Sequence, residues 1–162
     1  MKHTISILVE NHAGVLSRIS GLFARRGFNI DSLAVGITDD PSVSRVTIVA
    51  DDAGATVEQV EKQLNKLIDV IRLRRLGEGA ISRELMLLMV ECTEKTRSDI
   101  MDVVRVMGAK VCDISKSTLT VELSDTNDRL EIMLELLKPY RILEVARTGT
   151  IALEKGTSTL RV

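Results

Sequence analysis

The most constraining feature of this sequence is that one order of apolar patterns occurs twice. A period of two, typical of a strand, is followed by a helical period, two strand-like stretches, a second helix and a closing strand. Shifting the chain by 81 residues superposes Glu10 on Glu91 and Gly27 on Gly108. We interpret this as an internal duplication of a βαββαβ unit, a known way to pack two helices on one face of a sheet.

The first repeat can be divided by its periodicity. Strands are predicted around residues 5–10, 33–37, 46–50 and 71–74, and helices around residues 15–26 and 57–68. Gly27 is predicted to end the first helix, and Ile68 to close the buried stripe of the second. The sequence TDDPS at residues 38–42 is predicted to turn the chain between two strands.

The second repeat begins after the pattern breaks around Gly77, Glu78 and Gly79. Strands are predicted around residues 85–91, 110–114, 117–123 and 142–153, and helices around residues 100–107 and 130–137. We therefore expect an α+β fold of two tandem ferredoxin-like βαββαβ domains. The first is expected at residues 1–77, a linker at residues 78–83, and the second domain at residues 84–162.

Composition argues against several classes of partner. The 22 basic and 23 acidic residues give a net charge of −1, which supplies no overall field to attract nucleic acid or an anionic membrane. Cys92 and Cys112 are too few for a disulfide scaffold or a thiolate metal site. The start of the sequence lacks a signal-like apolar stretch, and no run of about 18 apolar residues occurs. A cytoplasmic protein is expected.

The sequence NHAG at residues 11–14 joins a strand pattern directly to a helix pattern. The free N–H groups at a helix N-terminus suit a carboxylate, and Gly14 permits close approach and a positive φ. Asn11 offers both a donor and an acceptor, so the loop suits a zwitterion. An alternative stays open, in which Asn11 forms an Asx-turn and Gly14 a tight bend.

Enzyme chemistry finds little support in the residues. The only histidines are His3 and His12, so there is no histidine cluster for a metal, and we expect His12 to be an exposed loop residue. No nucleophile motif and no phosphate-binding loop is present. We predict no catalytic residue and no metal site. The arginines at positions 72, 74 and 75 are predicted to solvate an edge strand.

Longer stretches carry a resemblance to a known family. They are ENHAGVLSRISGLFARRGFNIDSLAVG, TDDPSVSRVTIV and EKQLNKLIDV in the first half, and KVCDISKSTLTVEL and LLKPYRILEVARTG in the second. In these the chain resembles the small regulatory subunit of acetohydroxyacid synthase, also called acetolactate synthase. The first half is similar to an ACT domain, a module that binds small ligands, often amino acids.

The resemblance implies an effector site at a dimer junction. ACT domains of this family pair side by side into one continuous sheet, with valine bound across the junction. The residues implied are Asn11, His12, Ala13, Gly14, Val15 and Leu16 of one protomer, with Asn29 and Ile30 of the other. Ala13 stands where many relatives carry Pro, which frees the loop and lowers the affinity we expect.

The resemblance also implies partners. A homodimer through the ACT domains, a separate large catalytic subunit and the effector L-valine are expected, with no nucleic acid and no membrane. Thiamine diphosphate, magnesium and FAD are expected in the catalytic subunit, and no cofactor in this chain. The chain is then expected to activate the catalytic subunit in branched-chain amino acid biosynthesis and to confer feedback inhibition by valine.

Three rival functions share this fold. An RNA-binding domain needs aromatic residues on the sheet, and the two Phe and one Tyr do not stand in that arrangement. An acylphosphatase-like enzyme needs a phosphate-binding loop with Arg, which residues 11–14 lack. The third rival, an ACT-domain sensor of amino acids that regulates a different enzyme, is separated only by the resemblance of the second half.

Overall fold

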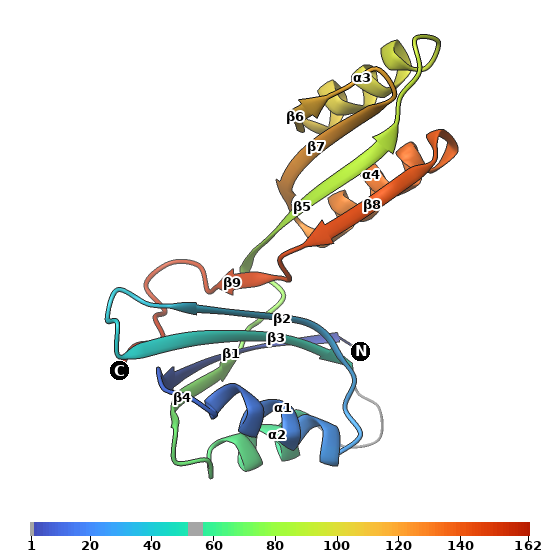
Figure 1. Cartoon of the computed structure of the whole chain (residues 1–162). Helices are drawn as coiled ribbons and strands as arrows, with labels where there is room; N and C mark the ends of the chain where they lie inside the picture. Colours follow the sequence, from blue (N-terminus) through green and yellow to red (C-terminus); the bar gives the residue numbers. More distant parts are fainter. Residues whose placement is uncertain (1, 52–56) are drawn as a thin grey trace. The chain divides into compact units, whose positions relative to one another are not determined.

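The protein is described by a computed structural model that covers residues 2–51 and 57–162. Its elements follow the predicted order. Contacts divide the chain into two compact units, one formed by residues up to Ile81 together with Thr150–Val162, and one formed by Ser82–Gly149. The predicted α+β fold with two βαββαβ units is confirmed (Figure 1).

The first unit is a four-stranded antiparallel sheet with two helices on one face (Figure 1). Its elements are β1 (Lys2–Glu10), α1 (Val15–Arg25), β2 (Ile30–Ile37), β3 (Val43–Asp51), α2 (Val57–Leu64) and β4 (Val70–Arg75). The strand order is β2-β3-β1-β4, so β2 and β4 are the edge strands. Ile7 lies at the centre, opposite Val46 of β3 and Leu73 of β4, and is fully buried beneath the helices.

The second unit repeats this topology. Its elements are β5 (Ile81–Glu91), α3 (Arg97–Met107), β6 (Lys110–Ile114), β7 (Thr118–Asp125), α4 (Asn127–Leu137), the short helix η1 (Lys138–Tyr140) and β8 (Ile142–Arg147). The strand order β6-β7-β5-β8 is equivalent to β2-β3-β1-β4. Gly27 and Gly108 follow the ends of α1 and α3 with the same φ of +70°, which confirms the predicted helix ends.

One predicted core residue is wrong. Ile68 was predicted to extend the buried stripe of the second helix, but α2 ends at Leu64 and the Ile68 side chain is 92% exposed. The chain leaves the helix through a tight bend, in which the Leu67 N–H donates to the Leu64 carbonyl. Leu67 still packs against the core, and the bend turns the next residue outward.

The C-terminal residues pack with the first unit, although the sequence interpretation placed them in the second domain. They include a short strand, β9 (Ile151–Leu153). Arg45 donates to the Leu160 carbonyl at 3.2 Å, and Arg74 donates to Ser158 Oγ at 2.9 Å. Ser6 alternates with the core residues of β1, so its side chain lies on the sheet face opposite the helices, and yet it is fully buried. The C-terminal residues contribute to this face. The predicted domain boundaries stay a prediction.

Candidate functional site

The loop between β1 and α1 presents an uncapped helix N-terminus. Gly14 has a φ of +88°, a left-handed conformation that Gly adopts without a steric penalty. Helix α1 starts at Val15, has no side-chain cap, and has no acidic residue in its first turn. The first N–H groups of α1 and its positive dipole end are therefore open to an anionic group.

Asn11 ties this loop to a distant turn. Its backbone N–H donates to the Ser42 carbonyl at 2.8 Å, and its side-chain Nδ2 donates to the Pro41 carbonyl at 2.9 Å. The turn itself is held by Asp40, whose carboxylate accepts from the N–H and the hydroxyl of Ser42. Asn11 thus makes a long-range contact, where an Asx-turn was the open alternative. Because the side-chain Nδ2 is the donor in this contact, Oδ1 can accept a hydrogen bond from a ligand.

His12 lies between two carboxylates. Its Nε2 is 2.9 Å from Asp69 Oδ1 and 3.2 Å from Glu10 Oε2, and its Nδ1 is 3.2 Å from the Ala13 carbonyl oxygen. All of these partners accept hydrogen bonds, so both ring nitrogens must carry protons for every contact to form. The Ala13 carbonyl does most to raise the pKa of His12 above its ordinary 6.5, against the lowering effect of partial burial. Glu10 and Asp69 raise it further.

This contact predicts a pH dependence. A raised pKa in the folded chain means that the ion pairs of His12 are complete below pH 6.5 and are lost as the pH rises through the folded value. In an NMR titration, we expect the His12 ring to titrate above 6.5 and to titrate lower in Glu10→Gln. The variant His12→Asn identifies the signal by its loss. A wild-type midpoint at or below 6.5 contradicts the geometry.

Arg18 is a site residue that the sequence interpretation missed. Its Nε donates to Asp69 Oδ2 at 2.6 Å, and this hydrogen bond is the largest cause of the lowered pKa of Asp69. A Cβ built on Gly14 would lie 3.2 Å from Arg18 Nη1, so the guanidinium stands directly beside the loop. The signal in the sequence was the spacing of four residues from Gly14, which is one helical turn.

Glu10, His12 and Asp69 also form the kind of group that binds metals, since one ligand atom from each lies within 4.8 Å of the others. The sequence interpretation did not consider them together, because Asp69 is far away in the chain. The guanidinium of Arg18 already contacts the Asp69 carboxylate. We therefore interpret the group as an ion-pair network that fixes the loop.

The remaining predicted residues divide between the two ends of α1. At its start, the Val15 side chain is buried in the core and leaves only its N–H for a ligand, whereas Leu16 is exposed. Past its end, Asn29 is exposed and donates from Nδ2 to Asp31 Oδ1 at 3.1 Å. Ile30 is half-buried at the start of β2.

A single chain does not assemble these residues into one pocket. Eleven residues of α1 separate the loop from the Asn29 and Ile30 segment, and they span about 16 Å at 1.5 Å per residue. An amino acid is much shorter than this helix. The two groups can therefore contact one small ligand only if they come from different copies of the chain.

The equivalent loop of the second unit is closed by its own side chains. The Thr93 N–H donates to Thr96 Oγ1 at 3.0 Å, and the Thr96 N–H donates to Thr93 Oγ1 at 3.3 Å. Asp99 lies in the first turn of α3 and complements its dipole. The N-terminus that is open in α1 is thus already balanced in α3.

Among the residues that the structure describes, no helix combines the length and the apolar character needed to cross a membrane.

Comparisons with known proteins agree along the whole chain. Residues 5–72 match the family model of an AHAS small subunit-like ACT domain, and residues 83–156 match that of the small subunit of acetolactate synthase. The acetolactate synthase small subunit of Mycolicibacterium smegmatis is 46% identical, over 95% of this chain and 91% of that protein. The isozyme 3 small subunit of Salmonella typhimurium is 40% identical, over 99% and 100%. The crystal structure of the Thermotoga maritima small subunit matches with a TM-score of 0.89 and 32% identity, over 98% and 99% of the two chains.

Proposed function

The chain belongs to the family of acetolactate synthase small subunits, and on this premise we propose that it confers feedback inhibition by L-valine on a separate catalytic subunit. Its first unit is an ACT domain. The effector binds where two ACT domains meet, with residues 11–16 of one copy and Asn29 and Ile30 of the other. The observation that carries this proposal is the open N-terminus of α1, which has no side-chain cap and no acidic residue in its first turn.

The chemistry of the loop suits an amino acid. The effector carboxylate accepts hydrogen bonds from the N–H groups around Gly14, Val15 and Leu16, where the helix dipole favours negative charge. Arg18 adds a positive charge beside Gly14, although its Nε already contacts Asp69. Asn11 Oδ1 accepts from the effector ammonium group. The exposed Leu16 and the half-buried Ile30 offer apolar surface for a branched side chain.

The dimer uses the β2 edge of the ACT sheet. The edge strands β2 and β4 differ in character, since β2 exposes Val35 and Ile37, at 48% and 67%, whereas β4 carries arginines. Two β4 edges would bring like charges together, while two β2 edges extend the sheet and bury apolar side chains. Asn29 and Ile30 lie at the start of this same β2 edge.

The chain acts through a catalytic subunit. That subunit carries thiamine diphosphate, magnesium and FAD, and this chain holds none of them. The chain raises the activity of the catalytic subunit, and valine shifts the assembly to a less active state. Such coupling typically amounts to about 1–3 kcal/mol, and it requires that valine bind one arrangement better than the other.

An ACT-domain sensor that regulates a different enzyme remains the alternative. The second unit separates the two, because residues 83–156 match a family model specific to acetolactate synthase small subunits. Reconstitution with an acetolactate synthase catalytic subunit distinguishes them directly. Activation by the purified chain supports our proposal, and unchanged activity supports the alternative.

The first test is titration calorimetry of the purified chain with L-valine, together with its mass in solution. We expect a dimer and saturable binding at one or two sites per dimer, because each junction needs two copies. D-valine and L-lysine serve as controls and are expected to give no saturable heat. A folded dimer that binds none of valine, leucine and isoleucine contradicts the proposed effector.

A further inference from the structure

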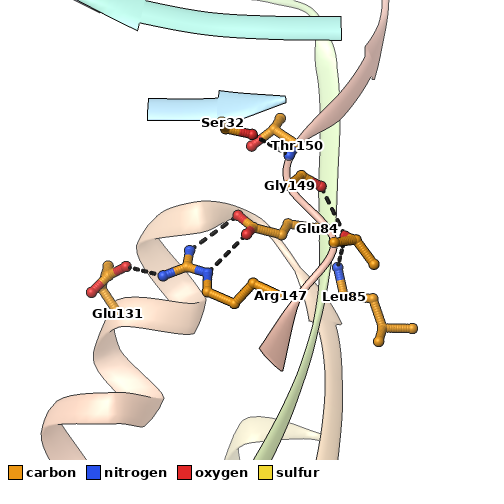
Figure 2. A network of polar contacts seen from close by, with 8 residues as sticks. Ser32, Glu84, Leu85, Glu131, Arg147, Gly149 and Thr150 are labelled. Carbon is orange, nitrogen blue, oxygen red and sulfur yellow. Dashed lines mark hydrogen bonds and ion pairs between the residues drawn. The ribbon is translucent and has the colours of Figure 1, made fainter. Parts of the chain in front are cut away.

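Polar contacts hold the chain on both sides of the point where it returns to the first unit. The chain enters the second unit after Ile81 and returns to the first between Gly149 and Thr150. Figure 2 shows Arg147 with its partners before this point and Thr150 with its partner after it. Each set of contacts lies within one unit, and residues 147–150 connect the two sets covalently.

Before the return point, Arg147 at the end of β8 is fixed to two other elements. It donates to both carboxylate oxygens of Glu84 in β5, at 2.8 and 3.0 Å, and to Glu131 of α4 at 2.7 Å. Glu84 is only 5% exposed. Burial disfavours its charge, but the hydrogen bonds from Arg147 outweigh this and hold the pKa of Glu84 below its ordinary value. Such a two-pronged pair fixes orientation as well as distance.

Thr148, the next residue, adds hydrogen bonds to the backbone of β5. The Thr148 N–H donates to the Leu85 carbonyl at 3.0 Å, and the Leu85 N–H donates back to Thr148 Oγ1 at 3.1 Å. Two hydrogen bonds therefore join Thr148, the residue after Arg147, to β5. The Leu85 amide at the beginning of β5 therefore reports on the position of residues 148–150.

After the return point, the first contact is to the strand that carries the proposed effector residues. The Thr150 N–H donates to Ser32 Oγ at 2.7 Å, and Ser32 follows Ile30 by two positions. Ile30 pairs with Ala50 and Ser32 with Val49, so the register of β2 shifts at Asp31. A bulge of this kind locally interrupts the ladder of hydrogen bonds and re-aims neighbouring side chains.

We propose that Ser32 and Arg147 are positioning residues that couple the effector site to the second unit. This inference rests on the proposed function, because it takes Asn29 and Ile30 as effector contacts. Effector binding fixes Asn29, which in the free chain donates to Asp31 within the bulge. When Asn29 turns from Asp31 to the effector, the bulge shifts and moves Ser32 Oγ, and the Thr150 N–H moves with it. Arg147, three residues before Thr150 in the sequence, transmits this movement to Glu84 and Glu131 through its hydrogen bonds.

Hydrogen exchange of individual amides tests this route without any catalytic subunit. In the wild-type chain, valine is expected to slow exchange at Thr150 and Leu85 by about tenfold, within the range that site-to-site coupling usually spans. In Ser32→Ala, valine affinity measured by calorimetry is expected to stay within about threefold, while the valine-dependent change at Leu85 disappears. Ser32→Thr keeps the hydroxyl and is expected to retain the change.

A matched control and a second variant complete the test. Ser158→Ala removes a hydroxyl that accepts from Arg74 in the same C-terminal segment, away from the route, and is expected to behave like the wild type. Arg147→Lys keeps the charge but loses the two-pronged contact with Glu84, and is expected to bind valine without a response at Leu85.

The outcomes separate this inference from the proposed function. If the wild-type chain binds valine but exchange at Thr150 and Leu85 does not change, the coupling route is overturned and the effector site stands. The same holds if Ser32→Ala and Arg147→Lys both respond like the wild type. If the wild-type chain binds no valine at all, the calorimetry alone overturns both.

Discussion

A chain with Gly14→Asp is expected to bind L-valine at least about 100-fold more weakly than the wild type, a loss of roughly 2.7 kcal/mol. The new carboxylate would stand at the N-terminus of α1, where the effector carboxylate accepts hydrogen bonds. The new carboxylate would also attract the guanidinium of Arg18, whose Nη1 would lie 3.2 Å from the new Cβ, and so compete with the effector for it. Hydrogen bonds to charged groups contribute about 1.5–3 kcal/mol each, so blocking them accounts for the expected loss.

Gly14→Asn is the matched control, because the backbone there has a φ of +88° and any side chain adds strain. Asn has the size of Asp, tolerates the left-handed conformation better than most residues, and carries no charge. We expect it to weaken valine binding by about tenfold or less, by crowding alone. Calorimetry on both variants, with circular dichroism to verify folding, separates charge from shape. Equal affinities of Gly14→Asp and the wild type contradict the proposed carboxylate position.

The fold was predictable because its signals are local. Alternation marks the strands, and a period near 3.6 marks the helices, since each reports which side chains face the same core. Gly27 and Gly108 were readable as helix ends because a left-handed residue at that position favours Gly. The repeat of one element order then left few topologies. The prediction that Ile68 is buried was wrong, because an apolar residue at helical spacing does not reveal that the helix has already ended.

The site was only partly predictable because several of its contacts join distant parts of the chain. Gly14 and the open helix N-terminus were read from adjacent residues. Asp69, which contacts His12 and Arg18, lies 51 residues after Arg18 in the sequence, and no spacing rule connects such distant positions. The packing of Thr150–Val162 with the first unit is a contact of the same kind, because these residues follow the second repeat in sequence while their partners lie in the first.

Charging the exposed edge of β2 is expected to abolish both the dimer and valine binding. In Val35→Lys combined with Ile37→Lys, two lysines from each copy would meet across the junction, where like charges repel and the apolar contact is lost. Charges on an edge strand are a natural device against edge pairing. We expect the mass in solution to fall to that of one 17.9 kDa chain. Calorimetric heat with L-valine should vanish although the chain stays folded, because the loop of one copy no longer faces Asn29 and Ile30 of another.

The matched control places the same two substitutions on another surface. Ile132→Lys combined with Leu136→Lys changes two apolar residues of α4 that are 49% and 44% exposed, and adds the same charge to the chain. This variant is expected to remain a dimer and to bind valine like the wild type. A β2 variant that is monomeric yet binds valine normally shows that one chain forms the whole site, which contradicts the junction. A β2 variant that stays dimeric and binds normally instead assigns the dimer to a different surface, because two lysines on each copy are incompatible with a continuous sheet through β2.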